Sequence, residues 1–114
     1  MTLLWSDVGA GPVGSHTLSL NLSSYTHVLI TFDTYVQSNW FAGWRTTCIA
    51  EVGQSCIQWD NGETGTYLNC RPFTVTTSGI TFDTAYWTTR YNSGMSNSSN
   101  CLVPLTIYGI TWGG

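Results

Sequence analysis

Two short segments of this chain, which we expect to form loops, place tryptophans beside polar side chains, a combination that suits saccharide binding. The first, Gln37 to Thr46, reads QSNWFAGWRT, and the second, Trp59 to Glu63, reads WDNGE. A sugar ring has an apolar C–H face, which can stack on a flat aromatic side chain, and a rim of hydroxyls, which fixed polar groups can bind. Each segment contains both kinds of group. The sequence therefore predicts a saccharide site that these two segments supply.

A third segment, Tyr91 to Asn100, is long and polar, and its first residue is another aromatic. For any one tryptophan, a place in the core or in a subunit interface is the competing interpretation. Arg45 could stack on a neighbouring tryptophan or bind a carboxylate or phosphate with both arms of its guanidinium. The candidate ligand-binding residues are Trp40, Trp44, Arg45, Trp59, Asp60, Asn61 and Tyr91.

Catalytic chemistry is less well supported than binding. A glycosidase needs two carboxylates across a cleft, whereas Asp60 and Glu63 flank an Asn-Gly turn, where acids are usually solvated. Asp33 and Asp83 both lie in the string Thr-Phe-Asp-Thr, which hints at paired strands. No Gly-x-Ser-x-Gly elbow and no phosphate-binding glycine motif is present. We expect no catalytic residues, and a glycan-depolymerising enzyme stays an alternative.

The four cysteines, at positions 48, 56, 70 and 101, do not have the spacing of a zinc site. Three disulfide pairings are possible, and free thiols that pack as small apolar side chains are slightly favoured over them. We expect no metal and no cofactor. A secreted, disulfide-bonded lectin is a further, weaker alternative.

The composition combines many aromatic residues with little charge. The 114 residues include 6 Trp, 6 Tyr and 4 Phe, while only 8% are charged and none is lysine. A domain of this size cannot bury so many aromatics, so several must lie at the surface or in interfaces. A surface with few charges favours association, and we therefore expect contact between identical copies.

Several classes of partner and location are disfavoured. The net charge of −3, with arginine as the only strong cation, argues against nucleic-acid binding. No apolar run approaches the length of a membrane span, so we expect no membrane insertion. The first 15 residues lack the positive region and the apolar stretch of a signal peptide.

The hydrophobic pattern has the two-residue period of strands rather than the period of a helix. The clearest strand is His27 to Val36. One face carries Val28, Ile30, Phe32 and Val36, and the other carries His27, Leu29, Thr31, Asp33 and Tyr35. A second, His16 to Leu22, alternates in the same way and directs Leu18, Leu20 and Leu22 inward. Leu3 to Trp5 is a short first strand.

Three further strands are expected in the second half of the chain. Tyr67 to Thr76 contains Pro72, which has no amide hydrogen for a ladder and so suggests a sheet edge or a bulge. Ile80 to Arg90 follows a Ser-Gly turn and places Ile80, Phe82 and Tyr86 on one face, and Leu102 to Trp112 is the last strand. Seven or eight strands at this spacing predict an all-β, antiparallel β-sandwich, jelly-roll-like, in one domain over residues 1–114.

The two ends of the chain resemble a known family. The start combines Leu3-Leu4-Trp5-Ser6, a Gly-rich link, His16-Thr17-Leu18-Ser19-Leu20 and Ser24-Tyr25-Thr26-His27-Val28-Leu29-Ile30, and the end contains Ile107-Tyr108-Gly109-Ile110. This order is similar to that of the C-terminal receptor-binding head domains of phage and prophage tail-fibre proteins. The similarity covers the chain from Met1 to about Val36 and from Leu105 onward. The segment between, Gln37 to Asn100, matches nothing in that pattern.

The resemblance implies a β-sandwich head that forms a homotrimer about a fibre axis and binds host cell-surface saccharide. It also implies that the chain is the C-terminal part of a longer fibre protein, assembled in the bacterial cytoplasm and located at the tail tip of a virion. Such heads share no fixed binding residues, so the candidate residues above come from the sequence alone. A trimerisation or capping domain that binds nothing is the main alternative function.

Overall fold

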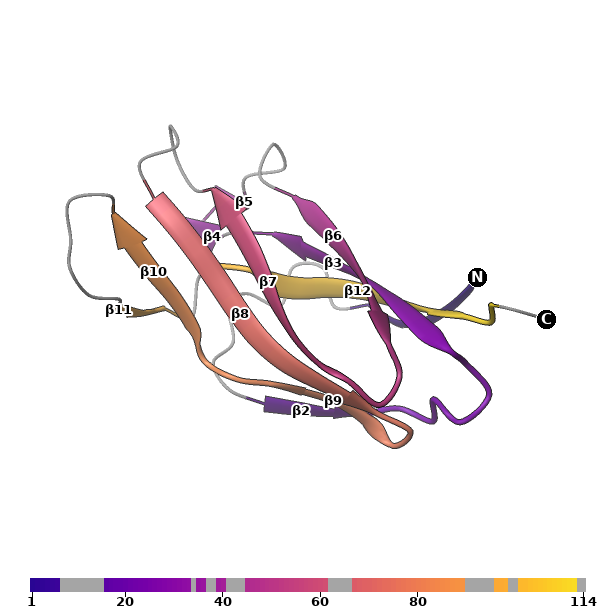
Figure 1. Cartoon of the computed structure of the whole chain (residues 1–114). Coiled ribbons are helices and arrows are strands. Elements are labelled where there is room, and N and C mark those ends of the chain that lie inside the picture. Colours follow the sequence, from indigo (N-terminus) through magenta and orange to yellow (C-terminus); the bar gives the residue numbers. More distant parts are fainter. Residues whose placement is uncertain are drawn as a thin grey trace.

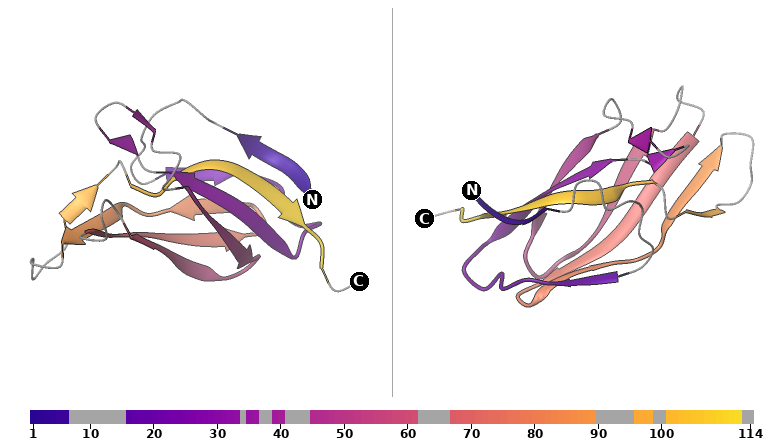
Figure 2. Two further views of the ribbon diagram at one scale, coloured as in Figure 1. Left: turned by 90° about the horizontal axis from the view of Figure 1, so that it is seen from above. Right: turned by 180° about the vertical axis from the view of Figure 1, so that it is seen from behind.

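The structure is a computed structural model, and it describes residues 1–6, 16–33, 35–36, 39–40, 45–61, 67–89, 96–98 and 101–112. Side chains are described for all of these except positions 16, 35, 36, 39, 40, 60, 61, 67, 87–89 and 96–98. Two antiparallel sheets pack face to face, as Figures 1 and 2 show. The expected all-β sandwich is therefore confirmed, and no helix occurs in the described ranges.

The first layer, sheet A, has four strands in the order β1-β12-β3-β6. Its members are β1 (Thr2–Ser6), β3 (His27–Asp33), β6 (Thr46–Glu51) and β12 (Val103–Ile110). The first strand pairs with the last, with Leu3 opposite Tyr108. Sheet A therefore holds both ends of the described chain.

The second layer, sheet B, is built around one long strand, β8 (Tyr67–Thr76). Strand β7 (Ser55–Asn61) pairs with one side of it, while β9 (Gly79–Phe82) and β10 (Ala85–Thr89) share the other side. The outer strands are β2 (His16–Ser19), beside β9, and β11 (Ser96–Ser98), beside β10. Strands β4 (Tyr35–Val36) and β5 (Asn39–Trp40) form a separate two-stranded hairpin.

The core between the sheets is centred on three phenylalanines. Phe32 of sheet A lies 5.9 Å from Phe73 and 6.2 Å from Phe82 of sheet B, between ring centroids, and the latter two rings are 5.7 Å apart. All three side chains are buried. Because burial of one such side chain contributes about 1.5–3 kcal/mol, this cluster is a main tie between the layers.

The alternation predicted for the clearest strand is confirmed from Val28 to Phe32, but the strand ends at Asp33 instead of Val36, and Asp33 is buried although the alternation placed it on the other face. Val28, Ile30 and Phe32 are fully buried, whereas the intervening residues on β3, up to Thr31, are only partly buried. The inward direction of Leu18, Leu20 and Leu22 is also confirmed, since they belong to the core cluster or pack against it. The period of the sequence thus identified the buried face correctly.

The placement of Pro72 at a sheet edge is wrong. Strand β8 is central, but its partner on one side changes from β10, at Cys70, to β9, at Phe73. Pro72 lies at this change, and its carbonyl accepts a 2.9 Å hydrogen bond from the backbone N–H of Asp83 in the link between β9 and β10. A residue without an amide hydrogen fits a position where the ladder is interrupted.

The same interruption makes a second expectation wrong. The sequence predicts that Tyr86 shares the inward face of Ile80 and Phe82. In the structure, Tyr86 is paired with Cys70 and so lies on the same face of the sheet. The next residue of β8, Arg71, faces inward, so Cys70 is on the outer face. Tyr86 therefore faces outward. The break after Phe82 shifts the alternation, because Asp83 and Thr84 belong to neither strand.

Two glycines with positive φ allow a test of the packing between β2 and β9. Gly79 has φ +151°, and a Cβ there would collide with the carbonyl oxygen of Leu18, whereas Gly53 has φ +102° and open space around it. We predict that Gly79→Ala lowers the free energy of unfolding by at least about 2 kcal/mol more than Gly53→Ala, because only the former adds a backbone clash to the dihedral cost. Urea denaturation of the two variants measures this, and equal losses would contradict the observed β2–β9 register.

Candidate functional site

The outer face of sheet B carries side chains in rows that the strand register aligns. Nearest the turn between β6 and β7 is a row of hydroxyls from four neighbouring strands, which we call the hydroxyl row: Ser55, Thr74, Thr81 and Thr17. The hydroxyls of Ser55 and Thr74 are 3.0 Å apart, and those of Thr17 and Thr81 are 3.1 Å apart. The row is exposed or partly exposed and offers hydrogen bonds to solvent or to a ligand.

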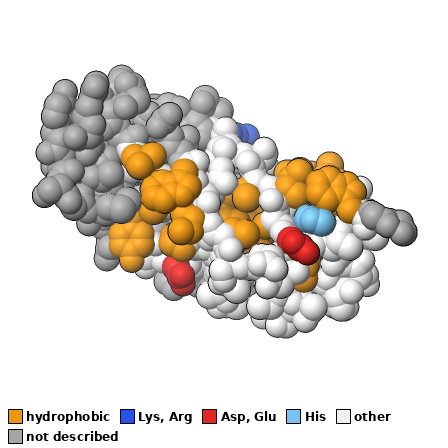
Figure 3. Space-filling view, viewed as in Figure 1, with side chains coloured by type: hydrophobic (Ala, Val, Ile, Leu, Met, Phe, Trp, Pro, Cys, Tyr) orange, Lys and Arg blue, Asp and Glu red, His pale blue; other side chains and the backbone are white. Residues whose placement is uncertain are grey.

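Further along the same strands is an aromatic row. Trp59 of β7 is opposite Cys70 of β8, which is opposite Tyr86 of β10. The Trp59 side chain is 49% exposed, and the neighbouring Leu68 is also exposed. In Figure 3, hydrophobic side chains gather over this part of β7 and β8, next to an acidic side chain. This surface combines a flat aromatic with apolar surroundings.

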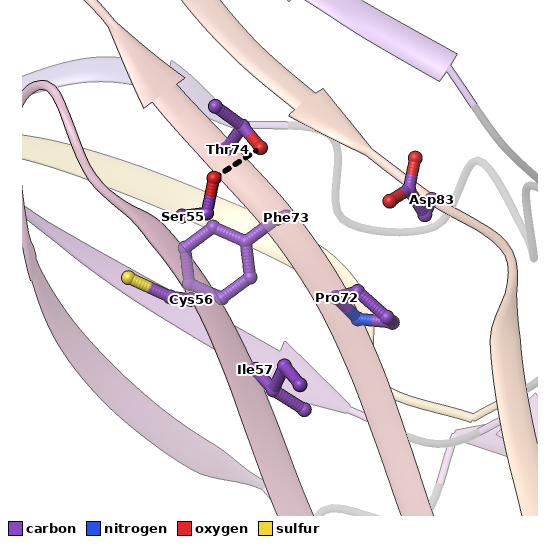
Figure 4. Close-up of a pocket in the computed structure, with 7 residues that line it drawn as sticks. All are labelled: Ser55, Cys56, Ile57, Pro72, Phe73, Thr74 and Asp83. Atoms are coloured by element: carbon purple, nitrogen blue, oxygen red, sulfur yellow. Dashed lines mark hydrogen bonds between the residues drawn. The ribbon is translucent and has the colours of Figure 1, made fainter.

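Between the two rows is a shallow pocket of about 340 Å³. Its walls come from β7, β8 and the β9–β10 link, and seven residues line it: Ser55, Cys56, Ile57, Pro72, Phe73, Thr74 and Asp83. Figure 4 shows the Ser55–Thr74 hydroxyl pair on one side and the Asp83 carboxylate on another. The break between β9 and β10, opposite Pro72, forms this pocket, because Asp83 lies beside β8 there instead of continuing a strand.

Among the side chains that the structure describes on this face, the charged one is Asp83, which is exposed. On the inner side of β8, the buried Arg71 has its guanidinium carbon 5.8 Å from the centre of the Phe82 ring. Burial lowers the pKa of Arg71, and the Cys101 thiol and the Asp83 carboxylate oppose that effect. Asp83 therefore interacts with a cation under the sheet while its side chain remains accessible from outside.

The candidate residues differ in how far the structure describes them. Trp59 is exposed, as a stacking residue must be, but it lies in β7 rather than in the expected loop. Asp60 and Asn61 also continue that strand, so the loop expected from Trp59 onward is wrong at its start. Trp40 ends the short strand β5. Trp44, Tyr91 and Glu63 lie outside the described residues.

Arg45 has a partner within the chain. Its Nε donates a 3.1 Å hydrogen bond to Oδ2 of Asp33, which is fully buried at the end of β3, while the Arg45 side chain is 45% exposed. The ion pair fixes the start of β6 to the end of β3. Arg45 thus has a structural role, and only its exposed part is open to a ligand.

The strands that flank the three predicted binding segments end at the same end of the sandwich. Phe32 at the end of β3 pairs with Thr46 at the start of β6, and Asn61 at the end of β7 pairs with Leu68 near the start of β8. Thr89, at the end of β10, pairs with Tyr67. We call this the loop end. The register therefore attaches the second and third segments beside the aromatic row of sheet B, and the first segment at the corresponding end of sheet A.

The described acids do not form a catalytic pair. Asp33 is buried against Arg45, Glu51 is at the opposite end of sheet A beside His27, and Asp83 is on sheet B. Within the described part of the chain, no three metal-ligating side chains cluster, and no helix there is long and apolar enough to cross a membrane.

The cysteines are free thiols with little nucleophilic character. Cys70 and Cys101 are buried, and Cys48 and Cys56 are half-buried between β6 and β7. Burial raises the pKa of Cys56 and Cys70, and it raises that of Cys48 together with the nearby Cys56. A raised pKa keeps these groups as thiols near neutral pH, which is the opposite of what a cysteine nucleophile needs.

Sequence reasoning missed Asp83, Ser55 and Thr74 as candidate residues. The sequence shows Asp83 in the string Thr-Phe-Asp-Thr. It does not show that Asp83 lies beside β8, because that position depends on the pairing of strands across the sheet. A comparison with known protein families, with characterised proteins and with solved structures finds no match to this chain.

Proposed function

We propose that this protein is a saccharide-binding module whose binding surface is the outer face of sheet B and the adjoining loop end. The observation that carries the proposal is Trp59, a half-exposed indole on a flat sheet surface, with Tyr86 in the same row and hydroxyls and a carboxylate nearby. Exposure of the apolar indole face to water is unfavourable, and stacking against the apolar face of a sugar removes that face from water. The polar side chains beside it then fix the orientation of the ring.

The resemblance to phage tail-fibre heads gives this binding a biological setting. We propose that the protein is the receptor-binding tip of a phage-like tail fibre, located on the virion, and that the saccharide is on the host cell surface. The geometry supports the arrangement because Thr2 and Ile110 lie at the end of the sandwich opposite the loop end. A fibre attached near the termini would leave the binding surface facing away from it.

Self-association is proposed through the outer face of sheet A. Four apolar side chains form one row there, which crosses every strand of the sheet: Leu3, Tyr108, Leu29 and Ile49. Leu3 and Ile49 are about half exposed. An apolar row of this kind, mostly aliphatic, gains more from burial against a second copy than from a hydrated sugar, and we assign it to the homotrimer interface.

The binding role of Trp59 can be tested against a matched tryptophan. Trp112 is 53% exposed, but it lies at the far end of the molecule, where its ring packs edge-on against His27. We predict that Trp59→Ala lowers affinity for surface glycans about tenfold, because it removes the stacking surface, worth about 1–2 kcal/mol. Trp112→Ala should bind like the unmodified protein on an array of bacterial surface oligosaccharides.

Retained binding by a folded Trp59→Ala variant would remove this surface from the proposal. Loss of binding in both variants would indicate a general effect on the fold. Circular dichroism and thermal unfolding of each variant distinguish these cases.

The interface assignment has an equally direct test. We predict that Ile49→Asp converts the trimer, of three 12.5 kDa chains, to a monomer, because it places charge in the apolar row of sheet A. Ile57→Asp changes a side chain of the same type and similar exposure on sheet B and should leave the mass unchanged. Light scattering during size-exclusion chromatography measures both, and a monomeric unmodified protein would refute the trimer.

A further inference from the structure

We propose that the pocket beside Asp83 is a second sugar subsite, which accepts an uncharged ring and rejects an acidic one. This inference rests on the proposed saccharide function and adds to it a substrate class and a minimum ligand length. Its residues are Ser55 and Thr74 of the hydroxyl row, the apolar pair Ile57 and Pro72, and Asp83.

The hydrogen-bonding groups of the pocket require a ligand that donates. The hydroxyls of Ser55 and Thr74 bond to each other at 3.0 Å, so one of their two hydrogens is already used. A carboxylate such as that of Asp83 only accepts hydrogen bonds, and the backbone N–H of Asp83 already donates to Pro72. The pocket thus presents several acceptors and one free hydroxyl donor, which suits the hydroxyl groups of a neutral sugar.

Charge excludes the alternative class of sugar. Among the described side chains that face outward on sheet B, Asp83 is the charged one, and its carboxylate is at the pocket wall. Arg71, a described cation on which Asp83 acts electrostatically, is fully buried on the inner face of β8 and out of reach of a ligand outside. A uronic acid or a phosphorylated sugar would therefore meet the like charge of Asp83, and the described side chains of this face offer it no accessible cation.

The spacing along β7 sets the minimum length of the ligand. Trp59, Ile57 and Ser55 are every second residue of β7 and all lie on its outer face. Successive members of this series are about 6.6–6.8 Å apart along the strand. The stacking residue and the hydroxyl pair are thus separated by about 13 Å along the strand. One ring cannot contact both, so an oligosaccharide occupies the two subsites together. The pocket volume of about 340 Å³ is at the small end for ligand pockets and fits one ring.

The test is an array of neutral oligosaccharides, each printed beside its uronic-acid counterpart of the same linkage. We expect the unmodified protein to prefer the neutral member of a pair about tenfold. In Asp83→Asn this preference should fall to about threefold or less, because the acidic member of each pair binds more tightly. The amide keeps the shape of the carboxylate but removes its charge. Trp59→Ala should weaken both members and leave their ratio unchanged.

A second variant covers the possibility that Asp83→Asn disturbs Arg71 and fails to fold. The double change Ser55→Ala and Thr74→Val removes the hydroxyls but no charge, and it should weaken neutral trisaccharides about tenfold while leaving monosaccharides bound at Trp59 unaffected. Thr111→Val, which removes an exposed hydroxyl at the far end of the molecule beside Trp112, is the control and should change neither.

The outcomes separate this inference from the function on which it rests. If Trp59→Ala loses binding while the Ser55/Thr74 double variant and a folded Asp83→Asn behave like the unmodified protein, the subsite is wrong and the saccharide function stands. Equal binding of neutral and acidic members also refutes the subsite. If the unmodified protein binds nothing on the array, both proposals fail.

Discussion

The burial of Phe32, Phe73 and Phe82 between the two sheets is the constraint from which the rest of the structure follows. A strand alternates with a period of two, so burial of one residue decides the direction of its neighbours. Because Phe73 faces inward on β8, its register partner Cys56 on β7 also faces inward, and Ser55, Ile57 and Trp59 must face solvent. The core thus creates the outer surface that we propose as the binding site. A slip of one residue in β7 would bury Trp59 and expose Cys56.

The interruption of sheet B at Pro72 gives this surface its shape. A continuous strand opposite β8 would have made the outer face flat, with no concave region. Instead, β9 ends at Phe82 and β10 begins at Ala85, and the link between them places a carboxylate beside β8. The cost of the interruption is reduced because Pro72 has no amide hydrogen to leave unpaired and its carbonyl still accepts a bond from Asp83. The interruption of the sheet and the proposed subsite therefore have the same origin.

Much of the fold could be predicted from the sequence, because the two-residue period is a local signal. It identified β8 with its observed bounds, Tyr67–Thr76, the buried face of β3, and the first and last strands. It failed where long-range pairing decides. The central place of β8, the outward direction of Tyr86 and the continuation of β7 through Asn61 depend on which strand lies alongside, and no short window contains that information.

The candidate site was only partly predictable for the same reason. Trp59 was found because an indole next to polar residues is conspicuous in the sequence, and its exposure agrees with a binding role. The hydroxyl row was not found, since its four members come from four strands and meet only through the register. Arg45 shows the converse: its residue type suggested ligand binding, but the fold pairs it with the buried Asp33. Residue type suggests chemistry, and tertiary pairing decides whether it is available.

The central claim is that a saccharide binds on the outer face of sheet B. The most direct measurement is a ¹⁵N–¹H spectrum of the tryptophan indole groups during titration with the neutral oligosaccharide that binds best. Our account predicts that the Nε1–H signal of Trp59 shifts saturably with added sugar, while that of Trp112, at the far end of the molecule, stays in place. A saturable shift elsewhere, with Trp59 unchanged, would contradict it.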